Sequence, residues 1–368
     1  MTPLEEPPDF DPFAPRRNPA LVGHGSAEQI LLQSAESGRL PHAVILGGPR
    51  GIGKATLAFR FARWLLARPD QPEPPSLFGA SAAAATMAVD PEHPVARRIS
   101  SGGHADLLTI ERGWDPKRKK LRGEIVVDDV RAVASFLRLT PAEGGWRVVV
   151  IDSADEMNRN AANALLKILE EPPRRALLLL VCHAPGRLLP TIRSRCCKLA
   201  LQPLAEAEVV ELLREHRPAV PVADATVLAR LADGSIGRAL DLADAGGLGL
   251  YQSLVALLAE LPRLDIPALH HLADRIAGTD AEAVFATLTE LLVDFLARLV
   301  AGAAEGRPRA VLPVEAELLR RLGSQTRLDR WIEVWENLRA LFGRADAVNL
   351  DRRQVVLDAF FTLEAASR

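Results

Sequence analysis

Cysteine is scarce in this chain, and the positions of the few cysteines exclude two kinds of stabilisation. The 368 residues contain only Cys182, Cys196 and Cys197. Because all three lie in one short segment and two are adjacent, they cannot form a disulfide framework or a four-ligand zinc site. This usage is typical of a reducing compartment, so we expect a cytoplasmic location.

Net charge and long apolar runs are also lacking. The formal net charge is −2, so no global positive field draws the chain to nucleic acid, and any DNA contact must be local or shared with partners. The longest apolar run, 176–182, has the length of a strand and is too short to cross a bilayer. The acidic, Pro-rich start of the chain lacks the apolar core of a signal peptide. We therefore expect no membrane partner.

Hydrophobic periodicity predicts a short flexible N-terminus (1–19) followed by an α/β domain (20–203). Apolar runs predict strands at 43–46, 107–111, 124–127, 146–151 and 177–181, and helical spacing predicts helices at 26–38, 56–67 and 128–139. Strands that alternate with helices form a parallel sheet. After Pro203 only helices are predicted, which divide into a small set (204–247) and a larger all-α domain (248–368). The clearest late helix begins at a capping box formed by Thr279 and Glu282.

A glycine-rich loop follows the first predicted strand and precedes a helix. Its sequence is Gly48-Pro49-Arg50-Gly51-Ile52-Gly53-Lys54. Glycines let successive backbone N–H groups surround phosphate oxygens, and the lysine neutralises the β and γ charges. An ordinary Gly-rich turn is the alternative, but the position between strand and helix favours phosphate binding by Gly48, Gly51, Gly53 and Lys54.

Two positions depart from the pattern of an active P-loop enzyme. The residue after the lysine, usually a Ser or Thr that coordinates Mg²⁺, is Ala55, and Thr56 lies about 100° further round the helix. The strand 146–151 ends in Asp152, which would reach the metal through water, but the next residue is Ser153 where a hydrolase has a glutamate. We therefore expect Thr56 and Asp152 to complete a nucleotide site that binds ATP and Mg²⁺ weakly and hydrolyses little.

Two carboxylates close to this strand end, Asp155 and Glu156, are possible substitutes for the missing glutamate. They begin the next turn of the chain, however, where they would point away from a bound phosphate. We interpret them as the solvated start of a helix.

A third motif carries a family resemblance. The run Asn163-Ala164-Leu165-Leu166-Lys167-Ile168-Leu169-Glu170-Glu171-Pro172-Pro173, followed by Ser194-Arg195-Cys196, resembles the clamp-loader branch of AAA+ proteins. The resemblance covers about residues 21–201. It implies an AAA+ P-loop sheet domain, a helical lid (204–247) and an all-α collar (248–368) through which subunits form a ring. It also implies that Arg195 projects into the ATP site of a neighbouring subunit, and that Arg159 contacts DNA.

Other family positions have changed. The first sensor position falls at Cys182-His183, and the second, a GxxR motif, falls at Gly234–Gly237, with Arg238 one residue out of step. This pattern is similar to δ′ subunits of bacterial DNA polymerase III clamp loaders. The implied partners are the γ/τ and δ subunits, the sliding clamp and primer–template DNA. The alternatives are an active γ/τ-like ATPase motor, and a P-loop scaffold outside replication.

Two further features bear on metal and DNA. Relatives in this branch carry a four-cysteine zinc module, whereas 69–103 contains no cysteine, so we expect no zinc. The basic run Lys117–Arg122 is interpreted as a solvated hairpin turn rather than as a DNA-binding patch.

Overall fold

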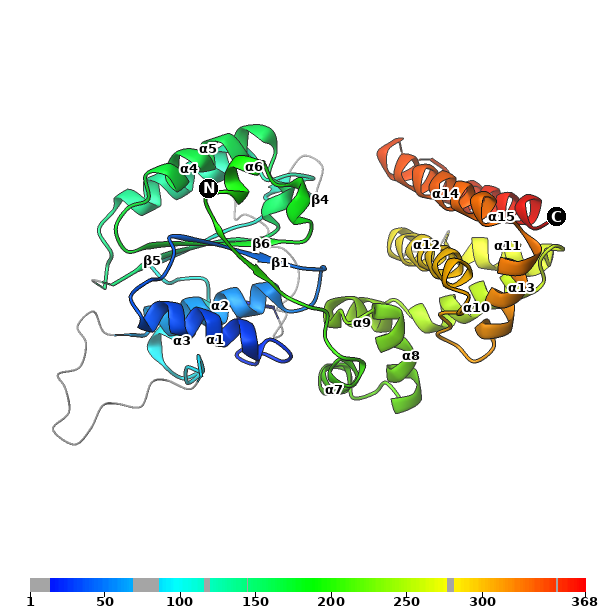
Figure 1. Ribbon diagram of the computed structural model, residues 1–368, viewed down its shortest axis with the longest axis horizontal. Helices are drawn as coiled ribbons and strands as arrows, with labels where there is room; N and C mark the ends of the chain where they lie inside the picture. The colour runs from blue at the N-terminus through cyan, green and yellow to red at the C-terminus, as the bar shows by residue number, and fades with distance from the viewer. Residues whose placement is uncertain (1–13, 69–85, 116–119, 144, 277–280, 349) are drawn as a thin grey trace, which may run out of the picture. The chain divides into compact units, whose positions relative to one another are not determined.

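The computed structural model describes residues 14–68, 86–115, 120–143, 145–276, 281–348 and 350–368. The chain divides into two compact units, Met1–Ala205 and Glu206–Arg368. Figure 1 shows that strands occur in the first unit and that the second is helical. Thr279 of the predicted capping box lies outside the described residues. In the described part of the chain, no single helix is long and apolar enough to span a bilayer; the bent pair of helices 236–244 and 247–259 passes that test only jointly.

A parallel five-stranded sheet forms the centre of the first unit. Its strands are β1 (Ala43–Gly47), β2 (Leu107–Ile110), β5 (Arg147–Ile151), β6 (Ala176–Cys182) and β7 (Cys197–Ala200), in the order β2-β5-β6-β1-β7. All pairs are parallel. The central strands β1, β5 and β6 are buried along their whole length, which explains why they read as continuous apolar runs.

Helices cover both faces of this sheet (Figure 1). One face carries α1 (Gly25–Glu36), α2 (Lys54–Leu66) and α3 (Pro94–Ser100), and the other carries α4 (Val127–Arg138), α5 (Arg159–Glu170) and the short α6 (Pro190–Arg193). Single 3-10 turns, η1 (Ala154–Glu156) and η2 (Pro185–Arg187), follow β5 and β6. Together with the helical second unit, this three-layer P-loop domain confirms the predicted fold class.

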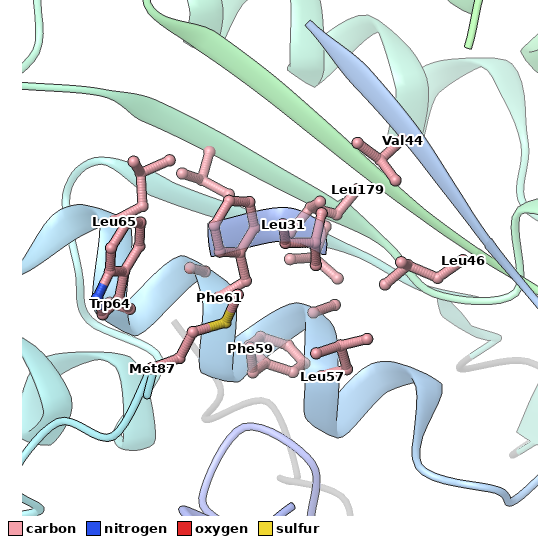
Figure 2. Close-up of a cluster of buried hydrophobic side chains, with 14 of the residues drawn as sticks. Leu31, Val44, Leu46, Leu57, Phe59, Phe61, Trp64, Leu65, Met87 and Leu179 are labelled. Carbon is pink, nitrogen blue, oxygen red and sulfur yellow. The ribbon is translucent and has the colours of Figure 1, made fainter. Parts of the chain in front are cut away.

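Alternate residues of each strand enter the two cores. Val44 and Leu46 pack under α1 and α2, whereas Ala43 and Ile45 pack under α4 and α5. Figure 2 shows the first core, to which α2 contributes Leu57, Phe59, Phe61 and Trp64. The rings of Phe61 and Trp64 stack with their centroids 5.8 Å apart. A polar or shortened residue at these positions would leave a cavity beneath the P-loop helix.

In the first unit one strand prediction was wrong, and one strand of the sheet was not predicted. Residues 124–127 form no strand: Ile125 makes an isolated bridge to Met157, and Val127 already begins α4. The chain before them forms a small antiparallel ribbon of β3 (Trp114–Asp115) and β4 (Lys120–Leu121). Strand β7 was not predicted, because it is a short edge strand that is mostly exposed and so has no apolar run.

The last residues of the N-terminal segment 1–19, which was predicted to be flexible, contact helix α2. The carbonyl oxygens of Asn18 and Pro19 accept hydrogen bonds, each of 2.6 Å, from Arg63 and Arg60 of α2. Glu28 of α1 in turn accepts from Arg60 at 2.9 Å. These contacts fix residues 18–19 against the first unit, while residues 1–13 lie outside the described part of the chain.

The second unit contains nine described helices. They are α7 (Glu206–His216), α8 (Val222–Ala232), α9 (Ile236–Asp244), α10 (Gly247–Ala259), α11 (Ile266–Arg275), α12 (Ala281–Glu305), α13 (Glu315–Gln325), α14 (Leu328–Val348) and α15 (Arg352–Ser367). A fully buried carboxylate, Glu315, joins three of them: it accepts from Tyr251 of α10 and lies 3.6 Å from Arg298 of α12. Buried charges of this kind are stable only when they are paired and hydrogen-bonded.

Candidate nucleotide site and arginine edge

The predicted phosphate loop joins the carboxyl end of β1 to the start of α2. Gly51 and Gly53 have positive φ angles of 75° and 102°, which favour glycine. A Cβ atom on Gly48 would lie 2.6 Å from the carbonyl oxygen of Leu201, so only glycine fits there. His24 lies beneath the loop and its Nε2 is 2.6 Å from the Ile52 carbonyl oxygen. That contact was not predicted, because an isolated histidine before a helix gives no sequence signal.

Lys54 lies at the centre of this site and is almost completely buried. Its ammonium group donates a hydrogen bond to the carbonyl oxygen of Pro49 within the loop. Burial lowers the pKa of Lys54 to about 8, although Asp152 and Asp155 favour the charged form. The lysine is therefore held inside the loop, close to two carboxylates, in a position where an incoming phosphate would have to replace the Pro49 contact.

Asp152 and Asp155 both face this lysine from the chain that follows β5. Burial raises the pKa of Asp152, and the nearby Glu111 raises it further. Asp155 accepts hydrogen bonds from the backbone N–H groups of His183 (2.8 Å) and Ala184 (3.0 Å). Burial opposes ionisation of Asp155, but these donors outweigh it and lower its pKa. The interpretation of Asp155 as a solvated residue was wrong, since it is 8% exposed and fastens the end of β6.

Glu156, the other carboxylate of that interpretation, is also engaged. Its Oε2 lies 2.9 Å from Arg112 Nε, with the side chains 20% and 29% exposed. Neither carboxylate after Ser153 is thus free to polarise an attacking water.

Ser153 stands where the family resemblance places a catalytic glutamate, and its hydroxyl is already bound. Its Oγ lies 3.1 Å from Nε2 of His183. Burial lowers the pKa of His183 to about 4, and the charge of Lys54 adds to this effect, so the imidazole is neutral at pH 7. Burial also raises the pKa of Cys182 to about 12. The two residues at the first sensor position therefore carry no charge toward a nucleotide.

The remaining predicted nucleotide contact is Thr56, in the first turn of α2 after Ala55. Both residues are partly buried, and Ala55 packs against the first hydrophobic core. Ala55, which has no oxygen in its side chain, directly follows the lysine. Within the described residues, no three His, Cys, Asp or Glu side chains are grouped as metal ligands.

Arg195 lies at the amino ends of the parallel strands (the amino edge of the sheet), whereas the P-loop follows the carboxyl end of β1 (the carboxyl edge). It precedes β7, whose first residue, Cys197, pairs with Val44 near the amino end of β1. The P-loop begins after Gly47, which pairs with Ala200. Because the strands are parallel and rise ~3.3 Å per residue, about 10 Å of strand separates these two levels of the sheet.

The Arg195 guanidinium is held on its own chain but stays accessible. Nη2 lies 3.0 Å from Glu170 Oε1, and Nη1 donates to the Thr191 carbonyl oxygen at 3.1 Å. The side chains of Arg195 and Glu170 are 38% and 51% exposed. This partner was not predicted, although Glu170 belongs to the motif that carries the family resemblance.

The last two arginines of interest have different surroundings. Arg159 is exposed at the start of α5, on the P-loop edge of the sheet, where Asn158 caps the helix by accepting from Ala161 N–H at 3.0 Å. In the second unit, Arg238 of α9 pairs with two carboxylates of α12, Glu290 (3.1 Å) and Asp294. The arginine next to the second sensor position thus has a structural role within its own unit.

The motifs of the first unit match a known protein family. The model of the family "DNA polymerase III, delta subunit" matches residues 23–205, nearly the whole first unit. This region belongs to that DNA polymerase III family. It contains the phosphate loop, Asp152 and Arg195.

Known relatives refine the assignment to the delta prime branch. The chain is 38% identical over 209 residues to DNA polymerase III subunit delta′ of Pseudomonas aeruginosa, covering 56% of this chain and 58% of the relative. It is 31% identical over 189 residues to delta′ of Bacillus subtilis, covering 51% and 50%. It is also 30% identical over 277 residues to subunit tau of Escherichia coli, covering 73% and 39%. The matches thus span between two fifths and three fifths of these relatives.

Among solved structures, a DNA polymerase III gamma subunit-related protein of Thermotoga maritima aligns with a TM-score of 0.40 and 18% identity, over 94% of this chain and 100% of that protein.

Proposed function

We propose that this chain is a δ′ subunit of a bacterial DNA polymerase III clamp loader, acting in the cytoplasm with γ/τ and δ subunits, a sliding clamp and primer–template DNA. In this proposal, residues 204–247 form the lid and residues 248–368 the collar that joins the ring. The chain's own ATP site binds nucleotide weakly and hydrolyses little, and Arg195 serves the site of a neighbour.

The observation that carries the proposal is the position of Arg195. It is half-exposed at the amino edge of the sheet, whereas Lys54 is buried at the carboxyl edge. An arginine that serves phosphoryl transfer must reach the reacting phosphate. Arg195 is remote from the phosphate loop of its own chain, so a phosphate on another subunit is the partner that this geometry favours.

The ion pair with Glu170 suggests how the Arg195 guanidinium is positioned before it contacts a neighbour's phosphate. Exposed ion pairs contribute about 0–1 kcal/mol to stability, so this pair exchanges easily for a stronger partner. A triphosphate offers the guanidinium a bidentate contact in a less hydrated site. Charge develops on the transferring phosphoryl group, and Arg195 stabilises it there.

The chain's own site supports the second half of the proposal. Lys54 and Ser153 are bound by groups of the same chain, and Ala55 supplies no oxygen for Mg²⁺. A phosphate can still displace Pro49 from Lys54, which is consistent with weak, phosphate-directed binding. Among the described residues around Ser153, no group takes the place of the missing glutamate.

The test is reconstitution of the ring with and without this chain. We expect DNA-stimulated ATPase and clamp loading to require the chain, and the purified chain alone to hydrolyse almost no ATP. Steady turnover by the isolated chain would favour the γ/τ-like motor instead. Failure to co-purify with γ/τ and δ subunits would favour a scaffold outside replication.

A further inference from the structure

His24 is buried directly beneath the phosphate loop, although it belongs to a different part of the chain. It is 3% exposed and occupies the N-cap position of α1. Its Nε2 lies 2.6 Å from the carbonyl oxygen of Ile52, which is 28 residues away in the sequence. A carbonyl oxygen can only accept a hydrogen bond, so Nε2 carries the proton and donates it to the loop.

The position of the His24 ring is fixed by the contacts of its helix. Glu28, one turn further along α1, accepts a hydrogen bond of 2.9 Å from Arg60 of α2. The apolar side of α1 packs in the first hydrophobic core. The ring also lies close to Gly53, where an added Cβ atom would be 3.5 Å from the Cδ2 and Nε2 atoms. The imidazole is therefore a donor held at one place under the loop.

The hydrogen bond from His24 determines which way the next peptide group points. A trans peptide unit is planar, with its C=O and N–H directed to opposite sides. Because the Ile52 carbonyl points toward His24, the N–H of Gly53 points to the other side, away from α1. Within the described part of the chain, neither this N–H nor that of Lys54 donates to a backbone oxygen. Both N–H groups can thus bind an anion at the start of α2, where the positive end of the helix dipole lies.

The glycine that the loop requires also makes this peptide unit easy to reverse. Gly53 has a φ of 102°, a conformation that glycine adopts without strain. Because glycine populates positive and negative φ about equally, the unit between Ile52 and Gly53 can rotate at little cost. The rotated unit would direct the Ile52 carbonyl oxygen at the anion, and its partial negative charge would oppose binding. The hydrogen bond from His24 favours the orientation that presents the N–H.

We propose that His24 is a positioning residue for the phosphate site, which holds the Gly53 N–H toward the diphosphate group shared by nucleotides and inorganic pyrophosphate. His24 acts through the Ile52 carbonyl and does not itself contact the anion. The ligand is a di- or triphosphate, because successive N–H groups and Lys54 can bind several phosphate oxygens at once. This inference rests on the proposed function only in requiring that the P-loop binds phosphate.

The experiment titrates the purified full chain calorimetrically with pyrophosphate and, in parallel, with ADP. Hydrogen bonds to charged groups are among the stronger ones in proteins, so His24→Ala should weaken the binding of both ligands about 10- to 150-fold. His24→Gln, whose amide nitrogen also donates, should recover most of the affinity, which a role in packing alone does not predict. The matched control is His42→Ala, at a half-buried histidine directly before β1, which should bind both ligands as the wild-type chain does.

A second measurement observes the peptide unit itself. In a heteronuclear NMR spectrum of the chain labelled at its glycine nitrogens, the Gly53 amide signal should shift when pyrophosphate is added. The shift should be lost in His24→Ala, because the N–H no longer faces the anion. Circular dichroism checks that each variant keeps its fold, and His24→Leu, which has a similar volume and no donor, replaces the alanine variant if that one is unstable.

The outcomes separate this inference from the proposed function. Equal affinity of the wild-type chain and His24→Ala for both ligands would overturn the inference and leave the proposed function intact. A loss that His24→Gln does not recover would mean that the ring only fills space, and the inference would be wrong. A wild-type chain that binds neither ligand would overturn the inference together with the nucleotide-binding part of the proposed function. Failure of clamp loading in a reconstituted ring bears on the proposed function alone.

Discussion

At the carboxyl edge of the sheet, the polar groups around the P-loop bind one another, whereas at the amino edge Arg195 and Glu170 remain open to solvent. Lys54 donates to Pro49, Ser153 contacts His183, and Asp155 binds two backbone N–H groups. Arg195 has only an exposed ion pair and one carbonyl oxygen of the preceding short helix. The polar groups of the predicted nucleotide site are thus hydrogen-bonded to one another, and the accessible arginine, Arg195, lies at the other ends of the strands. This difference supports the proposal that the chain serves a neighbour's ATP site more than its own.

The largest effect on the ATPase rate should come from comparing a substitution at Arg195 with one at Lys54. Arginine fingers contribute about 10³–10⁵ in rate, so Arg195→Ala should reduce turnover at the one site it borders by that factor. Lys54→Ala, at the other edge, should leave that site within a few-fold. ATPase of rings reconstituted with each variant measures both, with Arg195→Lys expected to rescue poorly because it lacks the planar fork. Equal losses from both variants would remove the distinction between the edges.

For the free energy of unfolding we expect the opposite order: a substitution at the carboxyl edge should cost more than one at the amino edge. Asp155→Ala leaves the N–H groups of His183 and Ala184 without their acceptor, and we expect a loss of about 1.5–3 kcal/mol in the free energy of unfolding. Glu170→Ala removes an exposed partner and should cost less than about 1 kcal/mol. Urea denaturation of the two variants measures this difference. Similar values for both would contradict the buried role of Asp155.

The pH dependence of phosphate binding should identify Lys54 as the anion contact. Its pKa is lowered to about 8, so the affinity of the full chain for pyrophosphate should fall as the pH rises through 8 and the ammonium loses its charge. Between pH 8 and the ordinary lysine pKa of 10.5, the unfolded chain binds more protons at this residue than the folded chain. Its contribution to the free energy of unfolding should therefore rise with pH over that window.

Calorimetric titration across that pH range measures the affinity, with Lys54→Gln as the control that should bind weakly at every pH. An affinity that stays constant through pH 8 in the wild-type chain would place the anion elsewhere.

The smallest effect should come from the partner of Arg195. Glu170→Gln frees the guanidinium from its exposed pair, and because such pairs contribute up to about 1 kcal/mol, the neighbour's ATPase should rise by up to about fivefold. Glu171→Gln, one residue further and also exposed, is the matched control and should change nothing. Reduced ATPase would mean that Glu170 orients Arg195 for reaction, and an unchanged rate would mean that the pair has no part in it.

Local sequence patterns predicted the central strands, the edge strand β2 and the phosphate loop, but they missed the other edge strand, β7. The patterns located β1, β5 and β6 because buried parallel strands are apolar throughout. They did not locate β7, and they predicted a strand at 124–127 that does not form, since short edge segments lack that pattern and pair according to their surroundings. In the site, the burial of Asp155 could not be predicted because it depends on β6, about thirty residues away in sequence.

The sequence by itself determined the phosphate loop, the absence of an oxygen after Lys54 and the motif around Arg195, because each depends on residue types at fixed spacing. The tertiary structure decided which edge of the sheet each residue occupies. That placement depends on the parallel register of β1 with β7 and on the crossing through α6, which bring Cys197 level with Val44 and leave Arg195 at the edge away from Lys54. Burial decided the hydrogen-bond partners and pKa values of these residues. A carboxylate or lysine is solvated when it lies on a surface, but it is bound by neighbouring groups when strands and helices enclose it.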